Sequence, residues 1–192
     1  MVESEKQLIA RVHSDKRVFR EVVEQHKQQV YYLALDLAGN HADAQDLSQE
    51  AFLKAYKAVD KFRGDSKLGS WLYRITVNCF IDMKRKRQIL TTNLEDKHEA
   101  EFIGSSKSKH ELAKQERGLE GAMLQKNIEK ALAQLTPRER SVFVLRHYQE
   151  FSLKEIAGVL SIAEGTVKSL LFRALQRLQK ELEYYRPDIG LE

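Results

Sequence analysis

Residues 152–180, SLKEIAGVLSIAEGTVKSLLFRALQRLQK, carry the pattern that decides the fold. A serine followed three residues later by a glutamate occurs twice here, as Ser152 with Glu155 and as Ser161 with Glu164. This spacing is that of a capping box, in which both side chains bond to free backbone N–H groups at a helix start. We therefore predict a short helix over residues 153–160 and, after a turn of about three residues, a long helix that begins near residue 162.

A third capping box precedes this stretch, at Thr136-Pro137-Arg138-Glu139. Its proline falls at the first helical position, where a missing N–H group leaves no helical hydrogen bond unmade. Two helices joined by a short turn form a helix-turn-helix, whose second helix lies in the major groove of DNA. The C-terminal part of the chain is thus predicted to contact DNA.

Projection of the long helix at 100° per residue separates an apolar face from a polar face. The apolar face is expected to pack on the core and holds Val167, Leu170, Leu171, Ala174, Leu175, Leu178 and Leu182. The polar face holds Thr166, Lys168, Ser169, Phe172, Arg173, Gln176, Arg177, Gln179 and Lys180. No acidic residue occurs between residues 165 and 180. Because a solvated helix usually mixes both signs of charge, this composition favours a face for phosphates over a basic surface without a ligand.

Groove entry uses the first turns of a recognition helix. We therefore expect Lys168, Ser169, Phe172 and Arg173 to read bases, with Thr166 beside them in the DNA-binding set. Arg177 and Lys180 are expected to contact phosphates. Phe172 either touches a thymine methyl group or a sugar, or is an incidental exposed ring.

An amphipathic helix is also predicted within residues 43–62, DAQDLSQEAFLKAYKAVDKF. Its apolar arc holds Leu47, Ala51, Phe52, Ala55, Ala58 and Val59. Its polar arc holds Asp43, Asp46, Gln49, Glu50, Lys54, Lys57 and Asp60, with Leu53 among them. A single exposed leucine needs no explanation. Set among acidic and amide side chains, it also fits the anchor of a protein interface, and both interpretations stay open.

The next segment, residues 61–88, is KFRGDSKLGSWLYRITVNCFIDMKRKRQ. Ser70 is predicted to cap a helix that is apolar on almost every side and ends in the basic run at residues 84–87. A helix of this kind is buried or meets another molecule. Aromatic rings beside cations suit single-stranded DNA, and a central core helix with a solvated basic end fits the spacing equally well.

The composition and the position of a polar segment complete the domain prediction. The 192 residues include 42% hydrophobic residues, two prolines and nine glycines, which favours long helices around a core. Residues 91–121, TTNLEDKHEAEFIGSSKSKHELAKQERGLEG, are polar and mixed in charge, and we expect a flexible linker there. The predicted fold is all-α, with helical domains over residues 1–90 and 122–192.

Several classes of protein are disfavoured by the same sequence. Cys79 is the only cysteine, so an intramolecular disulfide and a zinc site of several thiolates are excluded, and we expect it in the core. The first residues lack the apolar segment of a secretory signal, and no apolar run reaches the roughly 20 residues of a membrane span. We find no phosphate-binding glycine loop, nucleophile motif or metal-spaced histidine cluster. We expect a cytoplasmic protein that is not an enzyme, has no cofactor and does not insert into membranes.

These segments resemble a known family. Residues 43–87, DAQDLSQEAFLKAYKAVDKFRGDSKLGSWLYRITVNCFIDMKRKR, are similar to the second conserved region of extracytoplasmic-function (ECF) sigma factors, which belong to the sigma-70 family. Residues 135–178, LTPRERSVFVLRHYQEFSLKEIAGVLSIAEGTVKSLLFRALQRL, resemble their fourth region. The resemblance implies an alternative sigma factor that binds core RNA polymerase and directs initiation at promoters with particular −35 and −10 elements.

The resemblance also implies roles for individual residues and partners. In such proteins the helix matching residues 46–56 docks on the clamp helices of the polymerase β′ subunit, which nominates Asp46, Gln49, Glu50 and Leu53. The loop and helix that follow take the −10 element, which nominates Arg63, Trp71, Tyr73, Asn78, Lys84 and Arg87. The helix-turn-helix reads the −35 element and meets the polymerase β flap. Members are commonly held inactive by an anti-sigma factor and often act in stress or envelope responses.

The chain departs from the family pattern at two places in the long helix. Leu170 and Leu175 stand where the family often has arginine, and both fall on the predicted apolar face. The promoter sequence therefore cannot be taken over from a relative.

Three other classes of protein fit the sequence less well. The helix-turn-helix also resembles the DNA-binding domain of response regulators, but such a protein needs a phosphoacceptor domain with strands, and residues 5–90 show no strand pattern. An enzyme that acts on nucleic acid is disfavoured because the sequence has none of the catalytic motifs named above. A polymerase-binding adaptor without DNA contacts is disfavoured by the acid-free face of the long helix.

Overall fold

The computed structural model describes residues 5–62, 64, 66–93 and 119–183, and it divides the chain into two compact units. Unit 1 spans Met1–Ile103 and unit 2 spans Gly104–Glu192. Every regular element among the described residues is a helix, which confirms the all-α prediction.

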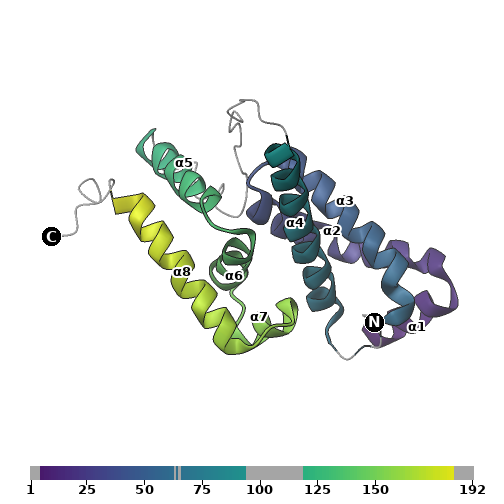
Figure 1. Cartoon of the computed structure of the whole chain (residues 1–192). Coiled ribbons are helices and arrows are strands. Elements are labelled where there is room, and N and C mark those ends of the chain that lie inside the picture. The colour runs from purple at the N-terminus through teal and green to yellow at the C-terminus, as the bar shows by residue number, and fades with distance from the viewer. Residues whose placement is uncertain (1–4, 63, 65, 94–118, 184–192) are drawn as a thin grey trace. The chain divides into compact units, whose positions relative to one another are not determined.

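Unit 1 is built on three long helices that pack against one another (Figure 1). Its elements are α1 (Glu5–Ser14), η1 (Lys16–Val18), α2 (Phe19–Ala38), α3 (His41–Ala58), η2 (Val59–Lys61) and α4 (Leu68–Asn93). Leu33 of α2, Leu47 of α3 and Phe80 of α4 are among the buried residues of this unit. The bundle forms because each helix has an apolar stripe to remove from water.

The turn between α2 and α3 follows from two residues. Gly39 has a φ of 84°, a left-handed conformation that glycine adopts without a steric penalty, and its N–H donates to the Leu35 carbonyl at 2.8 Å. Asn40 then caps α3, because its Oδ1 accepts from the Asp43 backbone N–H at 2.8 Å. This turn sets α3 beside α2 and leaves one face of α3 outward.

Unit 2 consists of α5 (Leu119–Ala133), α6 (Pro137–His147), α7 (Leu153–Leu160) and α8 (Glu164–Leu182), with α8 packed on the other three. The capping boxes predicted at Thr136 and Ser152 are both formed. Helices α7 and α8 are the predicted short and long helices of the helix-turn-helix.

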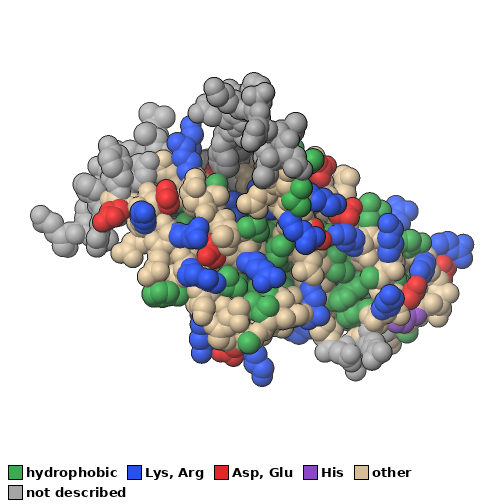
Figure 2. Space-filling view, viewed as in Figure 1, with side chains coloured by type: hydrophobic (Ala, Val, Ile, Leu, Met, Phe, Trp, Pro, Cys, Tyr) green, Lys and Arg blue, Asp and Glu red, His purple; other side chains and the backbone are tan. Residues whose placement is uncertain are grey.

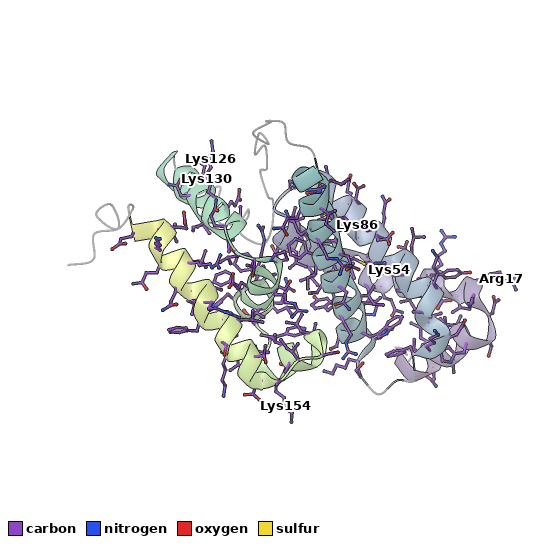
Figure 3. The ribbon with its side chains drawn as sticks, viewed as in Figure 1. Arg17, Lys54, Lys86, Lys126, Lys130 and Lys154 are labelled. Carbon is purple, nitrogen blue, oxygen red and sulfur yellow. The ribbon has the colours of Figure 1, made fainter. Side chains whose placement is uncertain are left out.

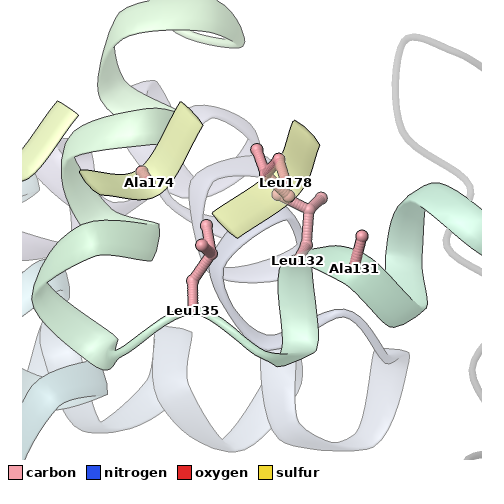
Figure 4. Packing of buried hydrophobic residues seen from close by; sticks show 5 residues of the cluster. All are labelled: Ala131, Leu132, Leu135, Ala174 and Leu178. Carbon is pink, nitrogen blue, oxygen red and sulfur yellow. The ribbon is translucent and has the colours of Figure 1, made fainter. Parts of the chain in front are cut away.

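One cluster of this core joins α5 to α8 (Figure 4). Its buried members are Ala131, Leu132, Leu135, Ala174 and Leu178, with Phe143 of α6 packed against them. This packing fixes which side of α8 faces outward.

The predicted capping box at Ser161 is not formed. Ser161 instead ends α7 in the left-handed conformation, with a φ of 53°, and its N–H bonds to the Ala157 carbonyl. Ile162 also donates to that carbonyl, at 3.1 Å, a six-residue closure typical of a Schellman motif. Because Ser161 serves the helix before it, α8 begins after Ala163 without a side-chain cap.

The start of α4 also differs from the prediction. The helix begins at Leu68, and the Trp71 N–H already donates to the Lys67 carbonyl at 3.1 Å, so Ser70 lies inside the helix. Leu68 is completely buried, and its packing supports a helix start ahead of the serine. Helix α4 continues to Asn93, and α5 starts at Leu119. Both helices therefore extend into residues 91–121, the segment predicted as a linker. Residues 94–118 of that segment lie outside the described residues.

Candidate DNA and partner interfaces

The polar face of α8 is exposed, as its sequence predicted. Val167, Leu170, Ala174 and Leu178 are buried beneath it. The candidate DNA-binding residues Thr166, Lys168, Ser169, Phe172, Arg173, Arg177 and Lys180 all stand on the exposed side. Over α8, Figure 2 shows several Lys and Arg side chains with apolar atoms among them. The surface therefore combines cations for phosphates with apolar contact area.

One residue of the predicted apolar face is not in the core. Leu175 is 44% exposed, so its placement with the buried leucines was wrong. Leu175 lies about 100° around the helix axis from the buried Ala174, at the edge of the apolar stripe, and the core does not cover it there. Leu170, the other departure from the family pattern, is buried as expected.

Four candidate base-reading residues share a shallow depression on α8. It is lined by Lys168, Ser169, Phe172 and Arg173. Phe172 is 62% exposed, and Lys168 pairs with Glu164 at 3.5 Å on the same helix. The Ser169 hydroxyl donates to the Gly165 carbonyl at 3.0 Å. The four residues predicted from spacing are thus brought together at the first turns of α8.

Arg173 and Arg177 lie on the side of α8 that adjoins α6. The carboxylate of Glu139 is 3.8 Å from Arg173 Nε and 3.5 Å from Arg177 Nε. Glu139 is 3% exposed, whereas the two arginine side chains are 57% and 51% exposed. The buried carboxylate of Glu139 therefore lies near two guanidinium groups that are still exposed to solvent.

Sequence reasoning overlooked Lys154 on α7. The residue is exposed and points away from unit 2 (Figure 3). The first helix of a helix-turn-helix crosses the DNA backbone. Its position in the first turn of the helix, two residues after the capping Ser152, was the signal that would have marked it as a phosphate contact.

On α3, the candidate polymerase-binding residues form one outward stripe. Asp46, Gln49, Glu50 and Leu53 recur at the three- and four-residue spacing of a helix face, and all four are exposed. Leu53 is 57% exposed, which confirms its predicted place among polar residues. An apolar side chain rimmed by carboxylates and an amide matches the anatomy of a protein-binding site.

The candidates on α4 do not share one face. Trp71 is half-buried and its ring centroid lies 4.9 Å from that of Phe62, while Asn78, two turns further along the same face, is exposed. Tyr73 lies on the other side of the helix, where burial, with a smaller contribution from Asp36, raises the pKa of its hydroxyl. Arg63 lies outside the described residues. The aromatic candidates are therefore partly structural.

The basic end of α4 is tied to the bundle. Arg87 donates to both carboxylate oxygens of Asp43 on α3, at 2.7 and 2.5 Å. The Arg87 contact holds the pKa of Asp43 below its ordinary value despite partial burial. Lys84 Nζ stands 5.8 Å from the centroid of the Phe80 ring. Both cations thus have partners within unit 1.

A second ion pair joins the same two helices. Lys54 of α3 lies 3.6 Å from Asp82 of α4, and Figure 3 shows Lys54 between these helices. Two cations that were not among the named candidates, Arg74 and Arg85 of the basic run, are exposed on the same side of α4 as Asn78. Their spacing from Asn78, at helical intervals, was the signal that would have found them.

Cys79 is buried, as expected, and burial raises the pKa of its thiol, which disfavours the reactive thiolate. Among the described residues, no group of three or more His, Cys, Asp or Glu side chains is arranged to hold a metal ion. Nor does any helix in the described ranges have the length and apolar character needed to cross a membrane.

Comparison with known proteins matches both units to one family. Residues 22–89 match the family model for sigma-70 region 2, and residues 125–178 match the model for sigma-70 region 4. The chain is 32% identical to the RNA polymerase sigma-H factor of Pseudomonas aeruginosa over 186 residues, which covers 94% of this chain and 95% of the relative. It is 33% identical to the ECF RNA polymerase sigma factor SigW of Bacillus subtilis, with 88% and 90% covered.

A solved structure shows the same likeness. The sigma factor RpoE of Bartonella quintana, crystallised with the anti-sigma factor NepR, superimposes with a TM-score of 0.60 at 26% identity. The match covers 86% of this chain and 96% of that one.

Proposed function

This chain belongs to the sigma-70 family and is an alternative sigma factor of the ECF type, and from that premise we propose how its two units divide the work of promoter recognition. Unit 1 docks on core RNA polymerase through α3 and takes the −10 element with α4. Unit 2 reads the −35 element with α8. The protein directs initiation and catalyses no reaction of its own.

The observation that carries this proposal is the outward face of α8. Seven candidate residues without a carboxylate among them stand in solvent on a helix whose opposite face is buried. Phosphate contacts from Arg177, Lys180 and Lys154 would position the helix, and contacts from Lys168, Phe172 and Arg173 would discriminate between bases. Each well-placed bidentate base contact contributes about 1–3 kcal/mol of discrimination.

The α3 stripe supports the polymerase-binding role of unit 1. Leu53 supplies an apolar anchor, and Asp46 and Glu50 add negative charge that complements a basic partner. The clamp helices of the β′ subunit are the partner that we assign to this stripe. We assign the β flap to unit 2.

The exposed side of α4 supports the −10 role. Trp71 and Asn78 lie there with Arg74 and Arg85, so a stacking ring, an amide and two cations share one side of the helix. Single-stranded DNA is held by this combination of aromatic and cationic groups. We assign Arg87 a smaller direct share, because its bidentate contact with Asp43 joins α4 to α3, whereas the contact of Arg85 with Asp82 stays within α4.

We also propose control by an anti-sigma factor. The Bartonella quintana sigma factor with this fold was crystallised with such a protein, and the exposed stripe on α3 is a surface that an inhibitor would cover. The resulting regulation suits a stress or envelope response. Because its partners are polymerase and promoter DNA, we place the protein in the cytoplasm.

In vitro transcription tests the proposal. Purified chain is added to core RNA polymerase and genomic DNA, and transcript 5′ ends are mapped. New start sites that depend on the added chain, preceded by shared −35 and −10 sequences, are the expected result. Absence of chain-dependent start sites would contradict it.

A second measurement separates a sigma factor from a helix-turn-helix regulator. Duplex containing a mapped promoter is titrated with the chain alone and with the reconstituted holoenzyme. Weak binding alone and strong, promoter-specific binding by the holoenzyme are expected. Tight binding without polymerase would favour the response-regulator interpretation instead.

A further inference from the structure

Glu139 is one of two buried acidic residues in the described part of unit 2, and the other is Glu129 on α5. The Glu139 side chain is 3% exposed, and its Oε2 accepts from the Thr136 backbone N–H at 3.0 Å in the capping box of α6. The same carboxylate faces α8, where it lies near Arg173 and Arg177. A residue that starts one helix thus also contacts two side chains of another.

The contact leaves both arginines able to bind DNA. In each case it is Nε that lies nearest to the carboxylate, at 3.8 and 3.5 Å. A guanidinium has five N–H groups, of which four are on the terminal nitrogens that face guanine or phosphate. The distances exceed those of good hydrogen bonds, so the carboxylate acts on the arginines mainly by its charge.

Arginine side chains have many rotamers, and fixing them on binding opposes affinity. A negative charge fixed under the helix favours the rotamers of Arg173 and Arg177 that keep Nε close to it. It also lowers the positive charge that a random phosphate would meet. Both effects favour one arrangement on DNA over many.

We propose that Glu139 is a positioning and specificity-determining residue of the DNA-reading face: its buried carboxylate holds Arg173 and Arg177 in the orientation that reads the −35 element and restrains their attraction for DNA of any sequence. This inference rests on the proposed function of α8. It adds a residue of α6 to a site otherwise made by the helix-turn-helix.

Glu139→Gln tests the inference because glutamine keeps the shape and an oxygen to accept from Thr136 but removes the charge. Reconstituted holoenzyme is assayed on a mapped promoter and on the same promoter with a substituted −35 element. Discrimination between the two is expected to fall about tenfold, while affinity for unrelated duplex rises. Thr136→Ala is the matched control, since it weakens the cap and leaves the carboxylate in place, and its discrimination should match wild type.

A double-mutant cycle with Arg173→Ala separates positioning from folding. In the Arg173→Ala background, Glu139→Gln should change discrimination much less than it does in wild type. Additive effects, or unchanged discrimination in a Glu139→Gln variant that melts like wild type, would overturn the inference. If Glu139→Gln does not fold, Glu139→Asp, which keeps the charge but withdraws it, is measured in the same way.

The wild-type measurement distinguishes failure of the proposed function from failure of the role proposed for Glu139. Wild-type holoenzyme that starts no promoter-specific transcript removes the proposed function and this inference with it. Wild-type holoenzyme that discriminates normally, beside a folded Glu139→Gln variant that discriminates equally well, removes the role of Glu139 alone.

Discussion

Helices α4 and α8 both carry basic residues, yet their cations are held differently. On α8, Arg173 and Arg177 share one buried carboxylate at 3.5–3.8 Å and remain about half exposed. On α4, Arg87 makes a bidentate pair at 2.5–2.7 Å with Asp43, whose side chain is 14% exposed. The loose arrangement leaves donors for DNA, whereas the tight one joins two helices. A basic run in a sequence therefore does not by itself identify a DNA contact.

The same comparison separates the two candidate surfaces of unit 1. The outward stripe of α3 has an exposed apolar residue, Leu53, whereas the basic end of α4 is engaged with α3. We therefore expect changes in the outward stripe of α3 to affect assembly with polymerase. Changes at Asp43 or Arg87, which pair with each other, should instead affect the stability of the bundle.

The largest effect is expected for Leu53→Glu. A charge placed at the apolar centre of an interface should weaken binding to core polymerase about 30-fold, the loss seen at interface hot spots. Competition with wild type for core enzyme measures it. Ile89→Glu on α4 is a matched control, because Ile89 is 55% exposed and Leu53 is 57% exposed. Equal competition by the Leu53→Glu variant would show that the α3 stripe does not bind polymerase.

Arg173→Ala is expected to reduce promoter-specific initiation about tenfold, because one base contact is lost. Binding to core polymerase should not change. The measurement is run-off transcription from a mapped promoter at fixed salt. Arg20→Ala, which removes an equal charge from an exposed site on α2 in unit 1, is the control. A loss of the same size in both variants would point to net charge and not to the recognition helix.

Asp43→Asn is expected to lower the free energy of unfolding of unit 1 by about 1 kcal/mol at pH 7, a discounted value for a partly exposed ion pair. The Arg87 contact lowers the folded pKa of Asp43 below its ordinary value of about 3.9. The stabilisation is therefore present above that value and is lost as pH falls through the folded pKa. Thermal melts should show a wild-type advantage at pH 7 that shrinks below about pH 4. A difference that does not depend on pH would contradict the ion-pair explanation.

The smallest effect is expected for Ser161→Gly. Ser161 has a φ of 53°, which costs a non-glycine residue about 1 kcal/mol, and glycine's greater freedom in the unfolded chain offsets part of the gain. Unit 2 should become more stable by at most about 0.5 kcal/mol. Chemical denaturation measures the change, and discrimination between promoters should stay the same. A destabilised variant would show that the serine side chain has a role beyond the turn.

Much of the fold followed from local signals. The capping boxes at Thr136 and Ser152 were found because their hydrogen bonds join residues three positions apart. The prediction of a capping box at Ser161 was wrong because Ser161 ends the preceding helix in the left-handed conformation. An N-cap residue needs a different backbone conformation. Local patterns cannot decide which helix a shared residue will serve.

The candidate sites were predictable to the extent that they lie on one helix. Helical spacing alone placed Leu53 and the polar face of α8 in solvent. It did not predict that Leu175 is exposed, because the edge of an apolar stripe is buried only where another helix covers it. It also did not show that Arg87 is paired with Asp43 of another helix.

The amino-acid sequence by itself determined the helices, their amphipathic faces and the family, because periodicity, capping and motif order depend on neighbours along the chain. Only the tertiary structure decided which charges meet. Asp43 and Arg87 are 44 residues apart, and Glu139 reaches Arg173 from a different helix. A helix projection contains no information about the surface packed beside it. Packing therefore decided which cations brace the fold and which stay available to DNA.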